Sequence, residues 1–278
     1  MKSNTIIPLL VTLLVTIGCS SNKEYNYGIE YMHGNVKSVD LSVFKAKSKF
    51  GEVIEDEYIY NEFYSFNAHH QIEQIRMIED ELKDSPSLVL KFKYGKDNNL
   101  HTLNVYNSDG EIDRINEFQY SNGKIKKCNN YECYNDERDK YGTLNFSYSQ
   151  NQMIVEMIYD HDKYTYIIDY NDKGRTIRIT LKGNGSNKNR AIKIERDKDE
   201  NILKTTNIRE ELISLDHVQL LLVLTMEPSL GLEYIEAENV YLYEYEFDEH
   251  HNWIKRIVYE NDKEHPQYIY KRSIEYYE

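Results

Sequence analysis

One hairpin-like unit recurs along most of the 278-residue chain and constrains its fold more than any other feature. Each unit has an aromatic residue, then a polar turn, then an apolar or β-branched residue at position +6 and often an apolar one at +9. Clear units begin at Phe66, Tyr94, Tyr106, Tyr170 and Phe247. Their turns contain Asn, Asp and Gly, which tolerate the positive φ angles of tight hairpins. Because short connections make consecutive strands neighbours, the repeat predicts an all-β fold: an antiparallel meander of hairpins that forms a large twisted or curled sheet.

The spacing inside the unit is odd. Positions +6 and +9 would point to opposite faces of a flat strand. Either both faces of the sheet are partly covered, or β-bulges shift the register. Some units are degraded: those at Tyr120 and Tyr148 are one residue shorter, and the one at Arg196 lacks the aromatic residue.

One segment departs from the β pattern. Asn207 followed by Glu210 resembles a capping box, and apolar residues then lie close to one helical face until Pro228. We therefore expect a helix near 208–226, inside an insertion at 207–227. It packs on the sheet or docks on a partner. The remainder of 28–278 is expected to be a single β-repeat domain.

The N-terminus reads as an export signal. Lys2 is the only charge before a mostly apolar run from Ile6 to Ile17, which is shorter than the roughly 20 residues that span a bilayer. The run ends in Thr-Ile-Gly-Cys at 16–19, which resembles the lipobox of bacterial lipoproteins, although Thr16 stands where Leu is usual. The prediction is a signal peptide at 1–18, a lipid on Cys19 and a polar tether at 19–27. The alternative is an ordinary signal peptide that contains a cysteine.

Net charge and composition narrow the classes of partner that this chain could bind. The formal net charge of −13 argues against nucleic acid and against an anionic membrane surface, since both reward clustered Lys and Arg. The chain has 26 Tyr against 8 Phe. Tyrosine suits half-exposed strand faces, where the ring packs and the hydroxyl remains in water.

The clearest units, Tyr-Asn-Asp-Lys-Gly at 170–174 and the segment 245–253, resemble the YD repeats of RHS-type proteins. Over most of its mature length the chain also resembles a group of uncharacterised Gram-negative envelope lipoproteins. The opening motif of this resemblance is His-Gly-Asn-Val-Lys-Ser-Val at 33–39. Its closing motif is Asn-Trp-Ile-Lys-Arg at 252–256, followed by Pro266 and Ile-Glu-Tyr-Tyr at 274–277. The resemblance implies an antiparallel β architecture and an address in the cell envelope, and it brings no catalytic residues.

Two groups of residues are candidate sites. Cys128 and Cys133 could close a tight disulfide loop in an oxidising compartment, remain free thiols, or contribute to a metal site. Trp253 follows the last turn and could stack with Tyr243 and Tyr245 on a sugar ring or a protein partner. The alternative is that Trp253 fills the end of the β core.

The remaining motifs do not point to chemistry. His69-His70 and His250-His251 occupy equivalent turn positions, so repeat geometry explains them without a metal. We find no zinc-protease, P-loop, nucleophile-elbow or dinucleotide fingerprint, and expect no cofactor. The expectation is a lipid-anchored binding or scaffold protein of the cell envelope, at the outer membrane, without catalytic activity and with a glycan or protein ligand. The alternatives are an enzyme acting on polysaccharide and a lipophile carrier with an apolar cavity.

Overall fold

The computed structural model describes residues 24–26, 31–78, 86–134, 137–159, 162–182, 190–206 and 240–278. These residues form strands and turns and contain no helix; within them, no helix has the length and hydropathy of a membrane span. The strands are β1 (Glu24–Asn26), β2 (Tyr31–His33), β3 (Val36–Lys49), β4 (Glu52–Phe66), β5 (Ile72–Ile78), β6 (Leu88–Tyr94), β7 (Leu100–Tyr106), β8 (Ile112–Ser121), β9 (Lys124–Tyr134), β10 (Glu137–Tyr148), β11 (Gln152–Tyr159), β12 (Asp162–Tyr170), β13 (Thr176–Lys182), β14 (Arg190–Arg196), β15 (Ile202–Thr206), β16 (Val240–Phe247), β17 (Trp253–Glu260) and β18 (Pro266–Tyr276).

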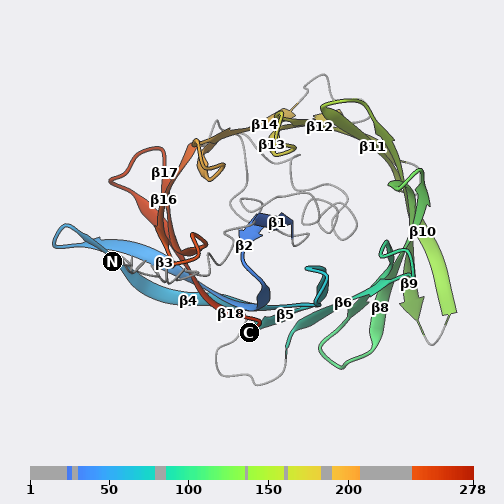
Figure 1. Cartoon of the computed structure of the whole chain (residues 1–278), viewed down its shortest axis with the longest axis horizontal. Coiled ribbons are helices and arrows are strands. Elements are labelled where there is room, and N and C mark those ends of the chain that lie inside the picture. Colours follow the sequence, from blue (N-terminus) through green and yellow to red (C-terminus); the bar gives the residue numbers. More distant parts are fainter. Residues whose placement is uncertain are drawn as a thin grey trace, which may run out of the picture.

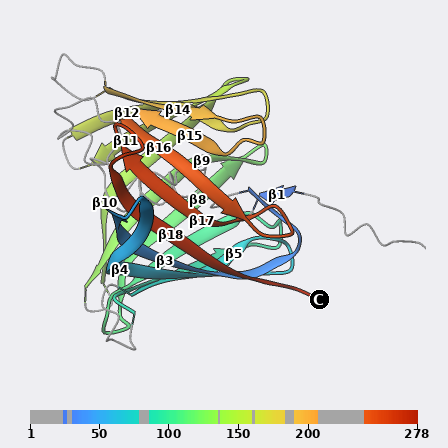
Figure 2. The same ribbon diagram turned by 90° about the vertical axis from the view of Figure 1, so that its left-hand side faces the viewer.

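Strands β3 to β18 form a closed antiparallel barrel of 16 strands, in which each strand pairs with the next one along the chain. The ring is completed where β18 pairs with β3, and the short β1–β2 hairpin lies inside it (Figure 1). The strands are tilted relative to one another (Figure 2). The all-β antiparallel meander is therefore confirmed. The large sheet, expected to be twisted or curled, is closed into a barrel rather than open. Closure removes both sheet edges, whose unpaired backbone groups would otherwise need cover.

Two other expectations concern the helical insertion and the N-terminal segment. The helix near 208–226, in the insertion 207–227, lies outside the described residues, as do the signal peptide and Cys19. Part of the expected tether is folded, because residues 24–26 form β1 and pair with β2.

A β-bulge explains the odd spacing of the repeat. In the first unit Ile72 pairs with Phe66 and Gln74 pairs with Ser65, so Glu73 is an extra residue on β5. The bulge brings Ile72 and Ile75, at +6 and +9, to the same buried face. The units that begin at residues 94, 106, 170, 196 and 247 show the same register shift.

The turns of these units are also alike. In all six units, the residue that follows the first one makes two backbone hydrogen bonds. Its N–H donates to the carbonyl of the residue four positions later, and its carbonyl accepts from the N–H of the residue three positions later. In five, the side-chain oxygen of that Asn or Asp also accepts from two backbone N–H groups, as Asn171 does from Lys173 and Arg175 at 3.0 and 2.9 Å. The fourth turn residue has positive φ, whether it is Gly174 (79°) or His251 (66°). The side-chain cap and the left-handed position explain why Asn, Asp and Gly recur here.

Strand alternation places these turns at two ends of the barrel. Five of the six turns lie at the end that also holds His33 and the C-terminus, and we call this end the Asx rim (Figure 2). The β3–β4 turn and the turn at 107–111 lie at the opposite rim.

The inner and outer faces of the barrel differ in polarity. Buried apolar side chains from nearly every strand form one core cluster, which includes Met32 of β2. Because β2 lies inside the ring, the face that carries this cluster is the inner face (Figure 1). Outward positions carry ion pairs, such as Lys37–Glu275 at 2.7 Å and Lys255–Glu246 at 2.6 Å. The inside of the barrel is thus mainly apolar, and its outside is charged.

Candidate functional site

The three aromatic residues expected to contact a ligand come together inside the barrel wall. Trp253 is 5% exposed, and the centroid of its ring lies 6.2 Å from that of Tyr245. Tyr243 is also buried, with its hydroxyl 2.7 Å from the Thr205 hydroxyl. Trp253 therefore fills the core, and these residues do not form an open surface on which a sugar could stack.

Two arginines that the sequence reasoning missed surround Trp253. The guanidinium carbon of Arg272 is 3.3 Å from the centroid of the Trp253 ring. That of Arg256 is 4.8 Å from Trp253 and 4.2 Å from Tyr270. Desolvated cation–π contacts of this kind are worth about 2 kcal/mol. A signal for Arg256 was present in the sequence: it occupies the +9 position of the last unit, which the other clear units fill with an apolar residue.

A carboxylate accompanies the arginines. Glu62 accepts a hydrogen bond from the Tyr64 hydroxyl on β4. Burial raises the pKa of Glu62, while the Tyr64 hydrogen bond and the two arginines act in the opposite direction. The cluster lies across β16, β17, β18, β3 and β4, the strands on either side of the seam where the barrel closes. It is suited to fixing that seam.

At the Asx rim, the opening and closing sequence motifs meet. The side-chain amide of Asn252 donates to the His33 carbonyl and to the Tyr276 hydroxyl, both at 2.8 Å. It also accepts from the His33 N–H at 2.7 Å. The Tyr276 hydroxyl donates to Asp248 at 2.5 Å, and the His250 ring packs on the Tyr276 ring with centroids 4.2 Å apart. The two motifs therefore form a clasp at the point of closure.

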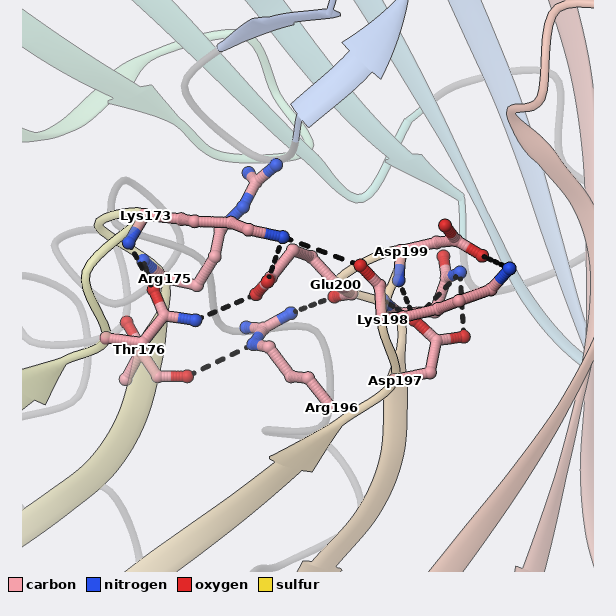
Figure 3. A network of polar contacts seen from close by, with 10 residues as sticks. Lys173, Arg175, Thr176, Arg196, Asp197, Lys198, Asp199 and Glu200 are labelled. Atoms are coloured by element: carbon pink, nitrogen blue, oxygen red, sulfur yellow. Dashed lines mark hydrogen bonds and ion pairs between the residues drawn. The ribbon is translucent and has the colours of Figure 1, made fainter.

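A second polar network joins neighbouring turns of the same rim (Figure 3). Arg196 donates from Nε to the Thr176 carbonyl at 3.2 Å and from its guanidinium to the Glu200 carbonyl at 2.8 Å. The Glu200 carboxylate pairs with Lys173 at 2.7 Å and accepts from the Asn171 amide at 2.8 Å. Arg196 occupies the position at which the other units have an aromatic residue. Its N–H groups bond the Thr176 and Glu200 carbonyls, which explains why this degraded unit still folds.

Tyrosine hydroxyls make the equivalent link elsewhere. Tyr94 donates to the Ile72 carbonyl at 2.8 Å, and Tyr245 donates to the Ile202 carbonyl at 2.9 Å. In each case the acceptor is the +6 residue of the preceding unit, beside its bulge. A tyrosine hydroxyl that bonds this carbonyl gives one physical reason why the chain has more Tyr than Phe.

The two cysteines are free thiols. They lie on β9, which pairs regularly with β8 over 128–132, and an odd spacing of five residues puts them on opposite faces. Their separation along the strand is about 16 Å, against the roughly 7 Å that a disulfide tolerates between Cα atoms. Burial raises the pKa of both thiols, Cys128 the more strongly. Of the three interpretations of the pair, the structure has the two free thiols.

Cys133 lines a groove on the outer face at the opposite rim. The groove has a volume of about 670 Å³. Ile112 and Tyr134 give it an apolar part and are 37% and 61% exposed. Glu111 and Glu137 supply carboxylates. No group of three or more His, Cys, Asp or Glu in the described ranges could hold a metal ion.

No protein-family model and no curated protein matches the chain. Among solved structures, a porin-like protein from Bacteroides uniformis ATCC 8492 is similar with a TM-score of 0.38 and 10% identity, over 86% of this chain and 96% of that one. The TcdB2-TccC3 structure gives 0.33 and 8%, over 79% of this chain and 14% of that one. The Tc holotoxin pore of Photorhabdus luminescens gives 0.30 and 7%, over 80% and 13%. This chain thus spans about a seventh of the toxin chains, and similarities this low do not bear on function.

Proposed function

We propose that this chain is a lipid-anchored binding or scaffold protein of the cell envelope, attached to the outer membrane through Cys19. The observation that carries the proposal is the polarity of the barrel. The apolar face points inward, and the outer face carries the ion pairs.

This polarity argues against contact between the wall and lipid tails. A barrel that spans a membrane shows an apolar band to the lipid and has polar groups inside. Two outward aromatic rings are covered by cations: Arg76 lies 4.4 Å from the Phe63 ring centroid, and Lys91 lies 4.7 Å from that of Tyr106. Attachment through a lipid on Cys19 is compatible with such a surface.

The position of β1, the first described strand, supports an orientation. Strand β1 begins at Glu24, and its partner β2 leads to the Asx rim through His33. Glu24 is five positions after Cys19, a reach of at most about 18 Å. The Asx rim then faces the membrane. A thioether-linked diacylglycerol and an N-acyl chain contribute about 0.8 kcal/mol per buried CH₂, which is enough for stable anchoring.

The inner wall favours a scaffold over a carrier. A carrier needs apolar wall residues that face an empty cavity. Wall residues on opposite sides of the ring are completely buried: Leu103, Val155, Ile192 and Val258 each have 0% exposure. The outer face is then the surface available to partners.

Replacement of Cys19 by Ala tests the anchor. Full-length wild-type chain should fractionate with membranes and incorporate labelled palmitate, whereas Cys19→Ala should do neither. Cys133→Ala is the matched control and should behave as wild type. Palmitate incorporation by Cys19→Ala, or a mature N-terminus beyond residue 19 in the wild type, would refute the proposal.

A further inference from the structure

The β3–β4 hairpin extends beyond its neighbours. Within the described residues, β18 pairs with β3 only as far as Lys45, and β5 pairs with β4 only from Asn61. Residues 46–57 therefore form a two-stranded arm, the light-blue hairpin that leaves the ring in Figure 1. An ion pair between Lys45 and Glu57, at 2.6 Å, holds the two strands together at the base of the arm.

The tip of the arm carries an aromatic residue that does not stabilise the fold. Phe50 is 96% exposed and has φ of 54°, followed by Gly51 at 84°. The chain builds an equivalent two-residue turn with Asn122 and Gly123, at 53° and 72°. Asn-Gly is the preferred pair for such turns, and a bulky residue with positive φ is strained. Strain together with full exposure indicates that Phe50 serves a contact outside the barrel.

The groove on the outer face has the properties to receive this tip. It lies at the same rim as the arm, and its volume of about 670 Å³ accommodates a phenyl ring. Ile112 and Tyr134 offer apolar surface. Asp113 and Arg138 also line the groove and pair with Arg114 and Glu117, whereas Glu111 and Glu137 pair with no cation of the described ranges. Lys49 lies 5.7 Å from the Phe50 ring centroid and would bring a positive charge into the groove with it.

We propose that the arm of one copy docks into the groove of a second copy, with Phe50 against Ile112 and Tyr134 and Lys49 near the two carboxylates. A copy does not fill its own groove, because β3 and β8 are five strands apart in the ring, about 24 Å at 4.8 Å per strand. Such a heterologous contact repeats from copy to copy and builds a ring or a filament.

This contact rests on the proposed function and gives the scaffold its building unit. Both features lie at the rim away from the anchor, so copies held in one membrane present the tip and the groove at the same height. Confinement to a surface raises their effective concentration and allows a small contact to operate.

Thiol cross-linking in membranes tests the docking, because the groove already contains Cys133. Glu52→Cys adds a thiol beside the tip and leaves Phe50 and Lys49 in place. A short bismaleimide should then link copies into dimers and longer species. Cys133→Ser in the same chain should abolish them, and Phe50→Asn should reduce them at least about tenfold while the urea midpoint stays equal or rises. Lys124→Cys, the equivalent position of the Asn122-Gly123 turn, is the matched control and should give no multimers.

Co-expression of two different chains tests whether the arm of one copy meets the groove of another. Glu52→Cys with Cys133→Ser, expressed together with wild type, should give dimers and nothing longer. The docking model is wrong if the Glu52→Cys chain gives no multimers, if multimers survive Phe50→Asn, or if they form without Cys133. Palmitate labelling reports separately on anchoring, and the cross-link can be measured in whichever fraction holds the chain.

Discussion

Asn252 and His33 are joined by two hydrogen bonds although 219 positions separate them in the sequence. The Asn252 amide accepts from the His33 N–H and donates to the His33 carbonyl, so one side chain pairs with the backbone as a neighbouring strand would. This contact fastens β2 to the turn between β16 and β17, close to the seam of the barrel.

Asn252→Ala should destabilise the protein by about 2–3 kcal/mol, because it leaves part-buried backbone groups of His33 without their partner. The midpoint of urea unfolding measures the loss. Asn201→Ala is the matched control: Asn201 holds the same place in its own turn, but among the described residues its side-chain amide donates only to Asp197. Equal losses in the two variants would show that the clasp adds nothing to the local turn.

Arg196→Tyr should be tolerated at a cost below about 1 kcal/mol, whereas Arg196→Met should cost about 1–3 kcal/mol. Tyrosine can donate to the Thr176 carbonyl as Tyr94 does to Ile72, but methionine has no donor. Urea unfolding of both variants checks the order. If methionine were as stable as tyrosine, the hydrogen bond would not be what retains this unit.

His251→Gly should stabilise the barrel by about 0.5 kcal/mol. Glycine adopts positive φ without strain, and this outweighs the loss of the edge contact between the His251 and His33 rings, whose centroids lie 6.4 Å apart. His250→Gly is the control and should destabilise, since it removes the ring that packs on Tyr276. Thermal unfolding should therefore move in opposite directions for the two neighbouring histidines.

Glu200→Gln should remove a pH-dependent part of the stability. Burial alone would raise the pKa of Glu200, but Lys173 and Asn171 lower it overall. A lowered pKa in the folded state gives stability that is present above the ordinary glutamate pKa and is lost as the pH falls through the folded value. The urea midpoint of wild type should exceed that of Glu200→Gln near pH 7, and the two curves should converge below about pH 4. Glu195→Gln, at a carboxylate that is 62% exposed, should follow wild type throughout.

The repeat could be recognised from the sequence because its determinants are local. A side-chain cap such as Asn171 and a left-handed residue such as Gly174 act within five positions of one another. The bulge was one of two explanations for the spacing, and the pairing of Ile72 with Phe66 selects it. Of the interior cluster around Trp253, the sequence analysis named the aromatic residues but not Arg256 and Arg272. Whether these arginines lie inside depends on which face of each strand turns inward, and no local pattern states this.

The sequence by itself determined the all-β class, the hairpin units and the turn residues, since each follows from contacts within one unit. Only the tertiary structure decided that the sheet closes, that Cys128 and Cys133 face opposite sides, and that Asn252 reaches His33. Closure depends on the twist and register summed over 16 strands and on contacts between the two ends of the chain. No local pattern contains that sum, because each pairing adds a small rotation whose total appears only when the last strand meets the first.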